Sequence, residues 1–101
     1  MVHNNGVRVE WDEAKNLENR RKHGLSFEEA QGLFASSDYL EIFDEAHSES
    51  EDRFIAIGPI TRGLVLVVWS ERDDDTLRII SARWANQREQ ALYYSYMDES
   101  L

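Results

Sequence analysis

With 101 residues the chain has the length of one small domain, and we expect a single domain over residues 1–101. It contains no cysteine, which excludes disulfide bonds, thiol catalysis and cysteine-based zinc sites and fits a reducing, cytoplasmic address. Its formal charge of −9 argues against non-specific attraction to nucleic acid, which a surplus of Lys and Arg normally drives.

A short strand and a capped helix open the chain. Apolar and polar residues alternate over 7–11, which predicts a strand after a flexible lead-in at 1–6. Asp12 can cap a helix over 12–23, and Gly24 stands where a left-handed residue would end it. The apolar face of this helix would be formed by Ala14, Leu17 and the aliphatic stem of Arg21.

A second helix and another strand follow. Ser26 and Glu29 have the spacing of a capping box, in which each side chain binds the other residue's free amide, so a helix is expected over 26–35. The aromatic-rich segment 39–43 predicts a strand. Segment 44–52 is acidic and rich in serine, which is typical of a solvated loop.

The second half of the chain predicts a β-meander and a final helix. Three β-type runs at 53–58, 64–70 and 76–82 are separated by spacings that suit antiparallel hairpins. The middle run is apolar on both faces, as a central strand covered on both sides would be. A helix starts near Ala85 and ends in a flexible tail at 98–101; its apolar stripe is formed by Ala85, Leu92 and Tyr96 and is widened by Ala91, Tyr93, Tyr94 and Met97. The predicted class is α+β, with element order β-α-α-β-β-β-β-α.

Three arginines, Arg53, Arg72 and Arg78, are expected to gather at one end of the meander, because hairpin pairing places Arg53 opposite about Ser70 and Thr76 beside the same edge. We call them the arginine cluster. Guanidinium groups held close together repel unless an anion or carboxylates lie among them. The cluster therefore predicts either a phosphate site or a surface ion-pair network with Glu71 and residues 73–75.

A second polar group marks the junction between the last strand and the last helix, where Asn86 can cap and Glu89 falls in the first turn beside Arg88. Helix capping with an ion pair and a functional role fit it equally well. Arg83 stands five residues beyond Arg78, roughly 16 Å along a strand and on the opposite face unless a bulge intervenes.

Proton-transfer groups are fewer. Tyr93 and Tyr94 lie roughly 12–14 Å along the last helix from its start, so one or both could reach the arginine cluster. His23 ends the basic run 20–22, which is more typical of a helix terminus than of a site, although histidine is the natural acid or base near neutral pH. The histidines and carboxylates show no metal-ligand spacing, and no phosphate-loop or dinucleotide motif occurs, so neither metal nor cofactor is expected.

Several segments in order carry a family resemblance: WDEAKN at 11–16, KHGLSFEEA at 22–30 with Phe34, RFIAIG at 53–58, and RIISAR at 78–83 followed by Asn86, Arg88, Glu89 and Tyr93. Together they resemble the BrnT toxin family over nearly the whole chain. The resemblance implies a RelE-like ribonuclease toxin of a type II toxin–antitoxin pair. It further implies neutralisation by a BrnA-type ribbon-helix-helix antitoxin, which also binds operator DNA, and toxin dimers inside a larger complex.

Metal-free RNA cleavage requires activation of a ribose 2′-hydroxyl, stabilisation of charge on the phosphorane and protonation of the leaving oxygen. In that framework the arginine cluster would hold the scissile phosphate. Tyr93 or His23 would transfer protons, and Glu89 would act as a base or orient an arginine. Further residues expected to bind RNA or a partner are Lys22, Arg83 and Arg88, with Tyr94 or Trp84 stacking on a base.

An interaction module without turnover is the alternative. Residues 1–52 hold five basic and thirteen acidic side chains, a balance of −8, whereas residues 53–101 hold six arginines and seven acids, a balance of −1. An acidic first half suits a basic antitoxin segment better than RNA. No apolar run approaches the roughly 20 residues that span a bilayer, so no membrane partner is expected.

Overall fold

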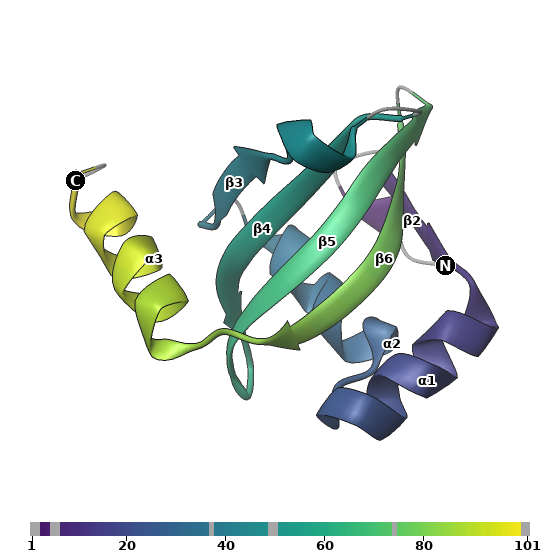
Figure 1. Ribbon diagram of the computed structural model, residues 1–101, viewed down its shortest axis with the longest axis horizontal. Helices are drawn as coiled ribbons and strands as arrows, with labels where there is room; N and C mark the ends of the chain where they lie inside the picture. Colours follow the sequence, from purple (N-terminus) through teal and green to yellow (C-terminus); the bar gives the residue numbers. More distant parts are fainter. Residues whose placement is uncertain (1–2, 5–6, 37, 49–50, 74, 100–101) are drawn as a thin grey trace.

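The computed structural model describes residues 3–4, 7–36, 38–48, 51–73 and 75–99, which build a six-stranded sheet with helices on both faces (Figure 1). In chain order the elements are β1 (His3–Asn4), β2 (Val7–Trp11), α1 (Glu13–His23), α2 (Phe27–Ala30), the 3₁₀ helix η1 (Gln31–Ala35), β3 (Leu40–Phe43), the 3₁₀ helix η2 (Glu45–His47), β4 (Arg53–Ile60), β5 (Gly63–Asp73), β6 (Thr76–Trp84) and α3 (Gln87–Glu99). The α+β class and the predicted order of elements are confirmed.

The sheet is mixed. Strands β4 to β6 form the antiparallel meander that the hairpin spacings predict, and β3 extends it by pairing antiparallel with β4. Strand β2 pairs in parallel with β6, and the strand order is β1-β2-β6-β5-β4-β3. Parallel neighbours need a long connection between them, and here the chain travels through both N-terminal helices and the meander before β6 meets β2. Strand β2, near the start of the chain, therefore lies beside β6, the last strand.

Three expected boundaries were wrong. The lead-in at 1–6 was expected to be flexible, yet β1 pairs with β2; residues 1–2 and 5–6 lie outside the described residues. The predicted loop at 44–52 contains η2, and its residues 49–50 are likewise not described. Helix α3 continues to Glu99 through the first half of the predicted tail at 98–101, of which 100–101 are not described.

Helix α1 begins and ends where its capping residues predict. Asp12 Oδ1 accepts hydrogen bonds from the backbone N–H of Ala14 at 2.8 Å and of Lys15 at 3.2 Å. Gly24 adopts a φ of 65°, the left-handed conformation that glycine tolerates at a helix C-terminus. The predicted apolar face is wrong, however, because Leu17 is 60% exposed.

Asparagines form the buried side of α1. Asn19 donates to the carbonyls of Leu25 and Ala82 and accepts from the N–H of Ala82, at 2.7 to 3.1 Å. Strand β2 ends opposite Ile79, so Ala82 lies just beyond the part of β6 that β2 covers. A carboxamide offers one acceptor and two donors, so Asn19 continues the edge pairing where β2 stops.

The short helix α2 shows half of the predicted capping box. Ser26 Oγ accepts from the N–H of Glu29 at 3.1 Å, but the Glu29 carboxylate binds Arg62 in the turn between β4 and β5 instead of returning to Ser26. The segment predicted as one helix over 26–35 continues as η1, so its extent is confirmed. This places α2 against the β4–β5 hairpin.

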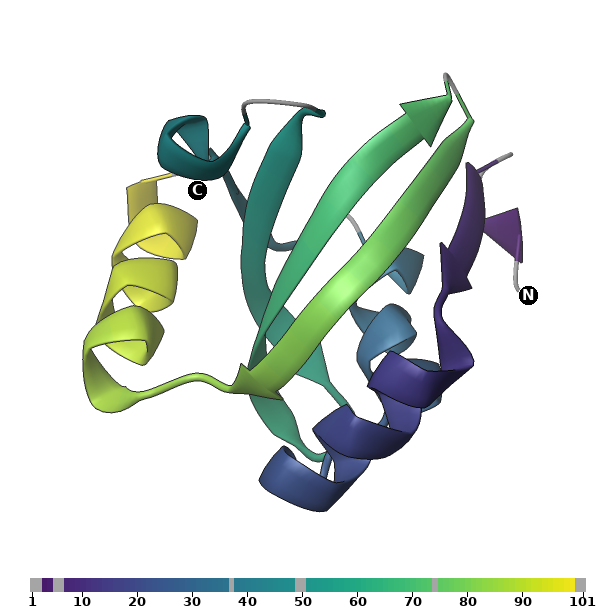
Figure 2. The same cartoon turned by 45° about the vertical axis from the view of Figure 1, so that its right-hand side comes forward.

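The core has two layers, one on each face of the sheet (Figure 2). On the face covered by α1 and α2, Phe27, Leu33 and Val67 are among the buried side chains. On the other face, Leu66 packs with Tyr93 of α3. Strand β5 contributes to both layers, as its two-sided apolar pattern predicted. Among the described helices, none is long and apolar enough to cross a membrane.

The face of α3 that packs on the sheet differs from the predicted stripe. Leu92 and Tyr96 were expected to face the core, but both are exposed, and Tyr93 is the helix residue that is buried. The helix lies toward the β3–β4 side of the sheet and contacts these two strands (Figure 1). A helix resting on one side of a sheet buries a narrow stripe, so most of its apolar residues stay at the surface.

Candidate functional site

Two arginines of the predicted cluster stand in a row across β4, β5 and β6, near the end of the meander at which β4 begins. Arg53 pairs with Ser70 across β4 and β5, as predicted, and Ser70 pairs with Arg78 across β5 and β6. Directly paired residues project from the same face of a sheet. Arg53 is four residues before Ile57, which belongs to the core layer under α3, so the three side chains lie on the α3 face. We call Arg53, Ser70 and Arg78 the arginine row.

Hydrogen-bonding capacity in this row is unused. Ser70 is 0% exposed, and within the part of the chain that the structure describes its Oγ has no hydrogen-bond partner. The same holds for the buried Nε of Arg53. Buried polar atoms without partners are rare and costly, and an N–H and an O–H side by side suit an anionic oxygen. Sequence reasoning treated Ser70 only as the position opposite Arg53.

Carboxylates from other segments pair with the remaining arginines. Arg78 Nη1 donates to Glu10 Oε2 at 2.7 Å, because Glu10 on β2 is its partner in the parallel register. Arg72 lies at a register shift in β5, outside the row, and its Nη1 is 3.9 Å from Glu51 Oε2. The prediction that Glu71 and residues 73–75 pair with these arginines was wrong for the residues that the structure describes. Residue 74 lies outside the described residues.

The reason for that error is the direction of Glu71. This residue pairs with Leu77, whose side chain belongs to the core layer under α1 and α2. Glu71 therefore projects from the face opposite the arginine row. The charges of Arg53, Arg78 and the paired Glu10 sum to +1 at the arginine row, whereas the whole chain carries −9.

The junction between β6 and α3 holds a bidentate ion pair. Arg83 donates to both carboxylate oxygens of Glu89, at 2.8 and 2.7 Å. Asn86 Oδ1 accepts from the N–H of Glu89 while Glu89 Oε1 accepts from the N–H of Asn86, each at 2.9 Å. These hydrogen bonds, Arg83 first, lower the pKa of Glu89 and keep its carboxylate ionised. The cap and the ion pair expected here are both present.

Arg78 and Arg83 share one face of β6, contrary to the sequence-based expectation. Trp69 pairs with Ile79 and the preceding Val68 pairs with Ser81, so Ile80 is an extra residue in β6. Without a bulge, residues five positions apart project from opposite faces of a strand. The extra residue places Arg78 and Arg83 on the same face. The α3 face therefore carries both the arginine row and the Arg83–Glu89 pair.

The proposed proton-transfer residues are not gathered at the row. Tyr93 is buried, and its hydroxyl donates to the carbonyl of Asp38 at 3.2 Å. Burial, reinforced by Asp38 and Tyr94, raises the pKa of Tyr93. His23 ends α1 on the opposite face of the sheet, where its carbonyl accepts from Trp84 Nε1 at 3.1 Å.

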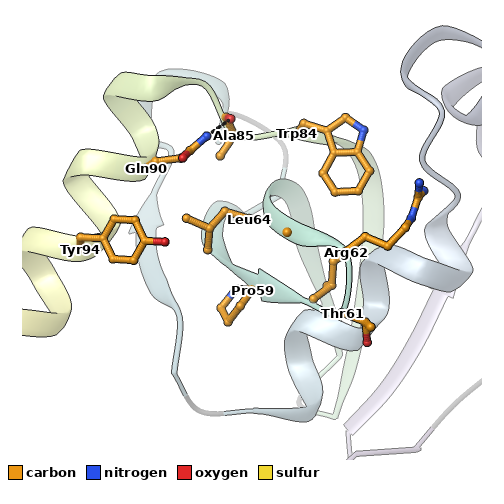
Figure 3. Close-up of a pocket in the computed structure, with 10 residues that line it drawn as sticks. Pro59, Thr61, Arg62, Leu64, Trp84, Ala85, Gln90 and Tyr94 are labelled. Carbon is orange, nitrogen blue, oxygen red and sulfur yellow. Dashed lines mark hydrogen bonds between the residues drawn. The ribbon is translucent and has the colours of Figure 1, made fainter.

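The remaining candidates lie apart from the row. Lys22 is exposed and 3.9 Å from Glu18, and Arg88 is exposed in the first turn of α3. Trp84 and Tyr94 line one pocket of about 520 Å³ between the β4–β5 turn and α3 (Figure 3). The sequence allowed Tyr93, Tyr94 or both to reach the arginine cluster, but the pocket that Tyr94 lines lies at the opposite end of the β4–β5 hairpin from Arg53. Within the described residues no group of His, Asp and Glu is placed to hold a metal ion.

The family model described as the ribonuclease toxin BrnT of a type II toxin–antitoxin system matches residues 11–89. The chain belongs to the BrnT family. The crystal structure of the Brucella abortus ribonuclease toxin, BrnT, resembles the fold with a TM-score of 0.62 and 25% sequence identity, over 80% of this chain and 99% of that chain. A search of curated proteins found no match.

The part of the chain that matches the BrnT family contains most of the site. The arginine row and the Arg83–Glu89 pair fall inside residues 11–89, while Glu10, Tyr93 and Tyr94 fall outside them. BrnT proteins are ribonuclease toxins of type II toxin–antitoxin systems, and that description applies to the family as a whole. The charged groups on the α3 face of the sheet form the candidate functional site.

Proposed function

We propose that this BrnT-family chain is an endoribonuclease that cleaves RNA on the α3 face of its sheet without a metal ion. The observation that carries the proposal is the unused hydrogen-bonding capacity of Ser70 and Arg53 beside Arg78. Both atoms are buried in the free protein, so a scissile phosphate would accept hydrogen bonds from them after the partly exposed side chains of Arg53 and Arg78 move aside. The guanidinium charges would stabilise the phosphorane, as a divalent cation does in metal-dependent nucleases.

Two carboxylates position the arginines in this proposal. Glu10 holds Arg78, and Glu89 holds Arg83 through two hydrogen bonds, which fixes the planar guanidinium groups before substrate arrives. The lowered pKa of Glu89 favours an arginine-orienting role over that of a general base, because a strongly paired carboxylate is a poor proton acceptor. Arg72 would add positive charge at the edge of the site.

The partner that we propose is a BrnA-type ribbon-helix-helix antitoxin. Membership in a family of type II toxin–antitoxin systems supports an antitoxin, and the balance of −8 in residues 1–52 supports a basic segment in it. Contact with operator DNA would occur through the antitoxin, because the acidic chain has little attraction for DNA. A toxin homodimer inside a larger cytoplasmic complex completes the proposal.

A catalytically inactive interaction module is the second candidate. The observation that favours it is that Arg72, Arg78 and Arg83 each already pair with a carboxylate. Such pairs can be purely structural, and exposed ones contribute little binding energy. In that case the chain would bind its antitoxin through the acidic surface and would not turn over RNA.

Cleavage of RNA by purified, antitoxin-free protein in the presence of a chelator separates the two candidates. Labelled single-stranded RNA, alone and with ribosomes, would be incubated with wild type, Arg78→Ala and Arg53→Ala. Arg21→Ala serves as the matched control, because Arg21 is exposed and pairs with Glu18 within α1. Cleavage that survives chelation, falls in the first two variants and persists in the control supports the ribonuclease. Absence of wild-type cleavage in every condition supports the interaction module.

A further inference from the structure

We propose that the pocket between the β4–β5 turn and α3 binds one nucleobase of the RNA and thereby sets a sequence preference. The inference rests on the proposed ribonuclease function. It starts from the convergence of Trp84 at the end of β6 and Tyr94 in α3 on a single pocket of about 520 Å³. That volume lies within the range of small-ligand sites and accommodates a base with its ribose.

The shape of the pocket suits a flat ring. Leu64 and Pro59 form an apolar floor between Tyr94 on one side and Trp84 on the other (Figure 3). The Trp84 wall is held in place, because its Nε1 donates to the His23 carbonyl and the guanidinium of Arg62 lies 5.0 Å from its ring centroid. Tyr94 is 57% exposed and offers an open face on which a base can stack.

Polar groups around the floor could read the edge of a base. Gln90 lines the pocket, and its Nε2 donates to the Ala85 carbonyl at 3.0 Å, which orients the side-chain carboxamide. The Thr61 hydroxyl lies on the turn at the other rim. Amide and hydroxyl groups beside an aromatic ring are the combination that recognises unstacked bases in single-stranded RNA.

The pocket lining offers no negative charge to a basic peptide. It includes one arginine, Arg62, whose charge is balanced by the Glu29 carboxylate outside the pocket, and no acidic residue among the described residues that form it, although the chain carries −9 overall. Two lining residues, Trp84 and Gln90, directly follow Arg83 and Glu89 in the sequence, so the pocket adjoins the bidentate ion pair. A strand of RNA could therefore place a phosphate near Arg83 and the attached base in the pocket.

The distance along β6 relates the pocket to the proposed cleavage site. Arg78 and Arg83 share one face, and their partners Ser70 and Leu66 are four residues apart on β5, which is roughly 13 Å at the ordinary rise of a strand. A base in the pocket would thus belong to a nucleotide near the scissile phosphate, not to the one that is cleaved. The pocket is a subsite for specificity, while the arginine row is the site of reaction.

Binding of an uncleavable RNA tests the pocket separately from catalysis. Single-stranded 2′-O-methyl RNA hexamers of each base would be titrated by fluorescence anisotropy, because they lack the 2′-hydroxyl nucleophile. Tyr94→Ala should weaken binding of the preferred hexamer by roughly tenfold to a hundredfold, as loss of one base–aromatic stack does. Tyr94→Phe should bind nearly as well as wild type. Tyr96→Ala is the control, since Tyr96 is 41% exposed on the same helix outside the pocket.

Nuclear magnetic resonance provides a second measurement of RNA binding at the pocket. The indole N–H signal of Trp84, assigned with Trp84→Phe, should shift on addition of the preferred hexamer. Equal affinities of Tyr94→Ala and Tyr96→Ala, or an indole signal that responds to purified antitoxin but not to RNA, would overturn the inference. If Arg78→Ala reduces cleavage while Tyr94→Ala binds RNA as well as wild type, the pocket does not bind a base and the proposed ribonuclease function stands. If RNA binding depends on Tyr94 but no cleavage is detected, the base-binding role of the pocket is supported and the proposed ribonuclease function is rejected.

Discussion

Arg78 and Arg83 project from the same face of β6 because Ile80 bulges out of register between them. A carboxylate from a different element holds each arginine: Glu10 of β2 binds Arg78 and Glu89 of α3 binds Arg83. The two guanidinium groups are thereby fixed at separate points of one surface. This arrangement makes several consequences measurable.

Replacement of the buried hydroxyl of Ser70 should affect stability and activity in opposite directions. Ser70→Ala removes a hydroxyl without a partner and should leave the free energy of unfolding unchanged or raise it by about 1 kcal/mol. RNA cleavage should fall at least roughly tenfold, because a hydrogen bond to the phosphate is lost. Urea unfolding and single-turnover cleavage measure the two effects. A variant that is less stable and fully active would show that Ser70 is structural only.

Asn19 should matter more for stability than the apolar Leu17 on the same helix. Asn19→Ala removes three buried hydrogen bonds and leaves the N–H and C=O of Ala82 without their partner, which should cost about 3 kcal/mol. Leu17→Ala, at an exposed position, should change the free energy of unfolding by less than about 0.5 kcal/mol. Chemical denaturation of both variants provides the comparison, and equal effects would contradict the docking role of Asn19.

The free energy of unfolding should fall at acid pH, in part because Glu89 becomes protonated and its ion pair with Arg83 is lost. Its ion pair with Arg83 lowers the pKa of Glu89 below the ordinary 4.5, so its contribution is present above that value and is lost as pH falls through the lowered folded pKa. The difference in unfolding free energy between wild type and Glu89→Gln should therefore be constant from neutral pH to about pH 5 and shrink below it.

Urea unfolding from pH 7 to pH 3 measures this difference. Asp98→Asn, an exposed change on the same helix, is the control and should follow the wild-type pH profile. A Glu89→Gln difference that stays constant down to pH 3 would mean that the ion pair does not contribute to folding.

Tyr93 should prove structural. Tyr93→Phe removes the hydrogen bond to the Asp38 carbonyl and should lower the free energy of unfolding by about 1 kcal/mol. Cleavage should stay within about twofold of wild type, because loss of a general acid would cost a factor of roughly a hundred or more. Measurement of kcat/KM alongside denaturation decides between the two roles, and a hundredfold loss of cleavage in a stable variant would assign proton transfer to Tyr93.

The features that sequence reasoning placed correctly depend on neighbours in the chain. Asp12 and Gly24 delimit α1, and the Asn86–Glu89 cap starts α3, because capping bonds join residues within one helical turn. The pairing of Arg53 with Ser70 followed from counting residues across a hairpin, whose turn fixes the register.

The rest of the site arises from contacts that no local period encodes. The predicted apolar face of α1 did not include Asn19, yet Asn19 docks α1 on Ala82, 63 residues away. The bulge at Ile80 leaves no mark in the alternation of β6, and it alone turned Arg83 to the face of Arg78. Glu10 met Arg78 only because β2 pairs in parallel beside β6.

The amino-acid sequence by itself therefore determined the elements, their order, the meander and the BrnT resemblance, since these follow from capping, alternation and ordered motifs along the chain. The tertiary structure decided which side chains share a face: the arginine row, the arginine–carboxylate pairs and the pocket that joins Trp84 to Tyr94. The physical reason is that register, bulges and helix docking are set by long-range packing and hydrogen bonding, which bring together residues from opposite ends of the chain.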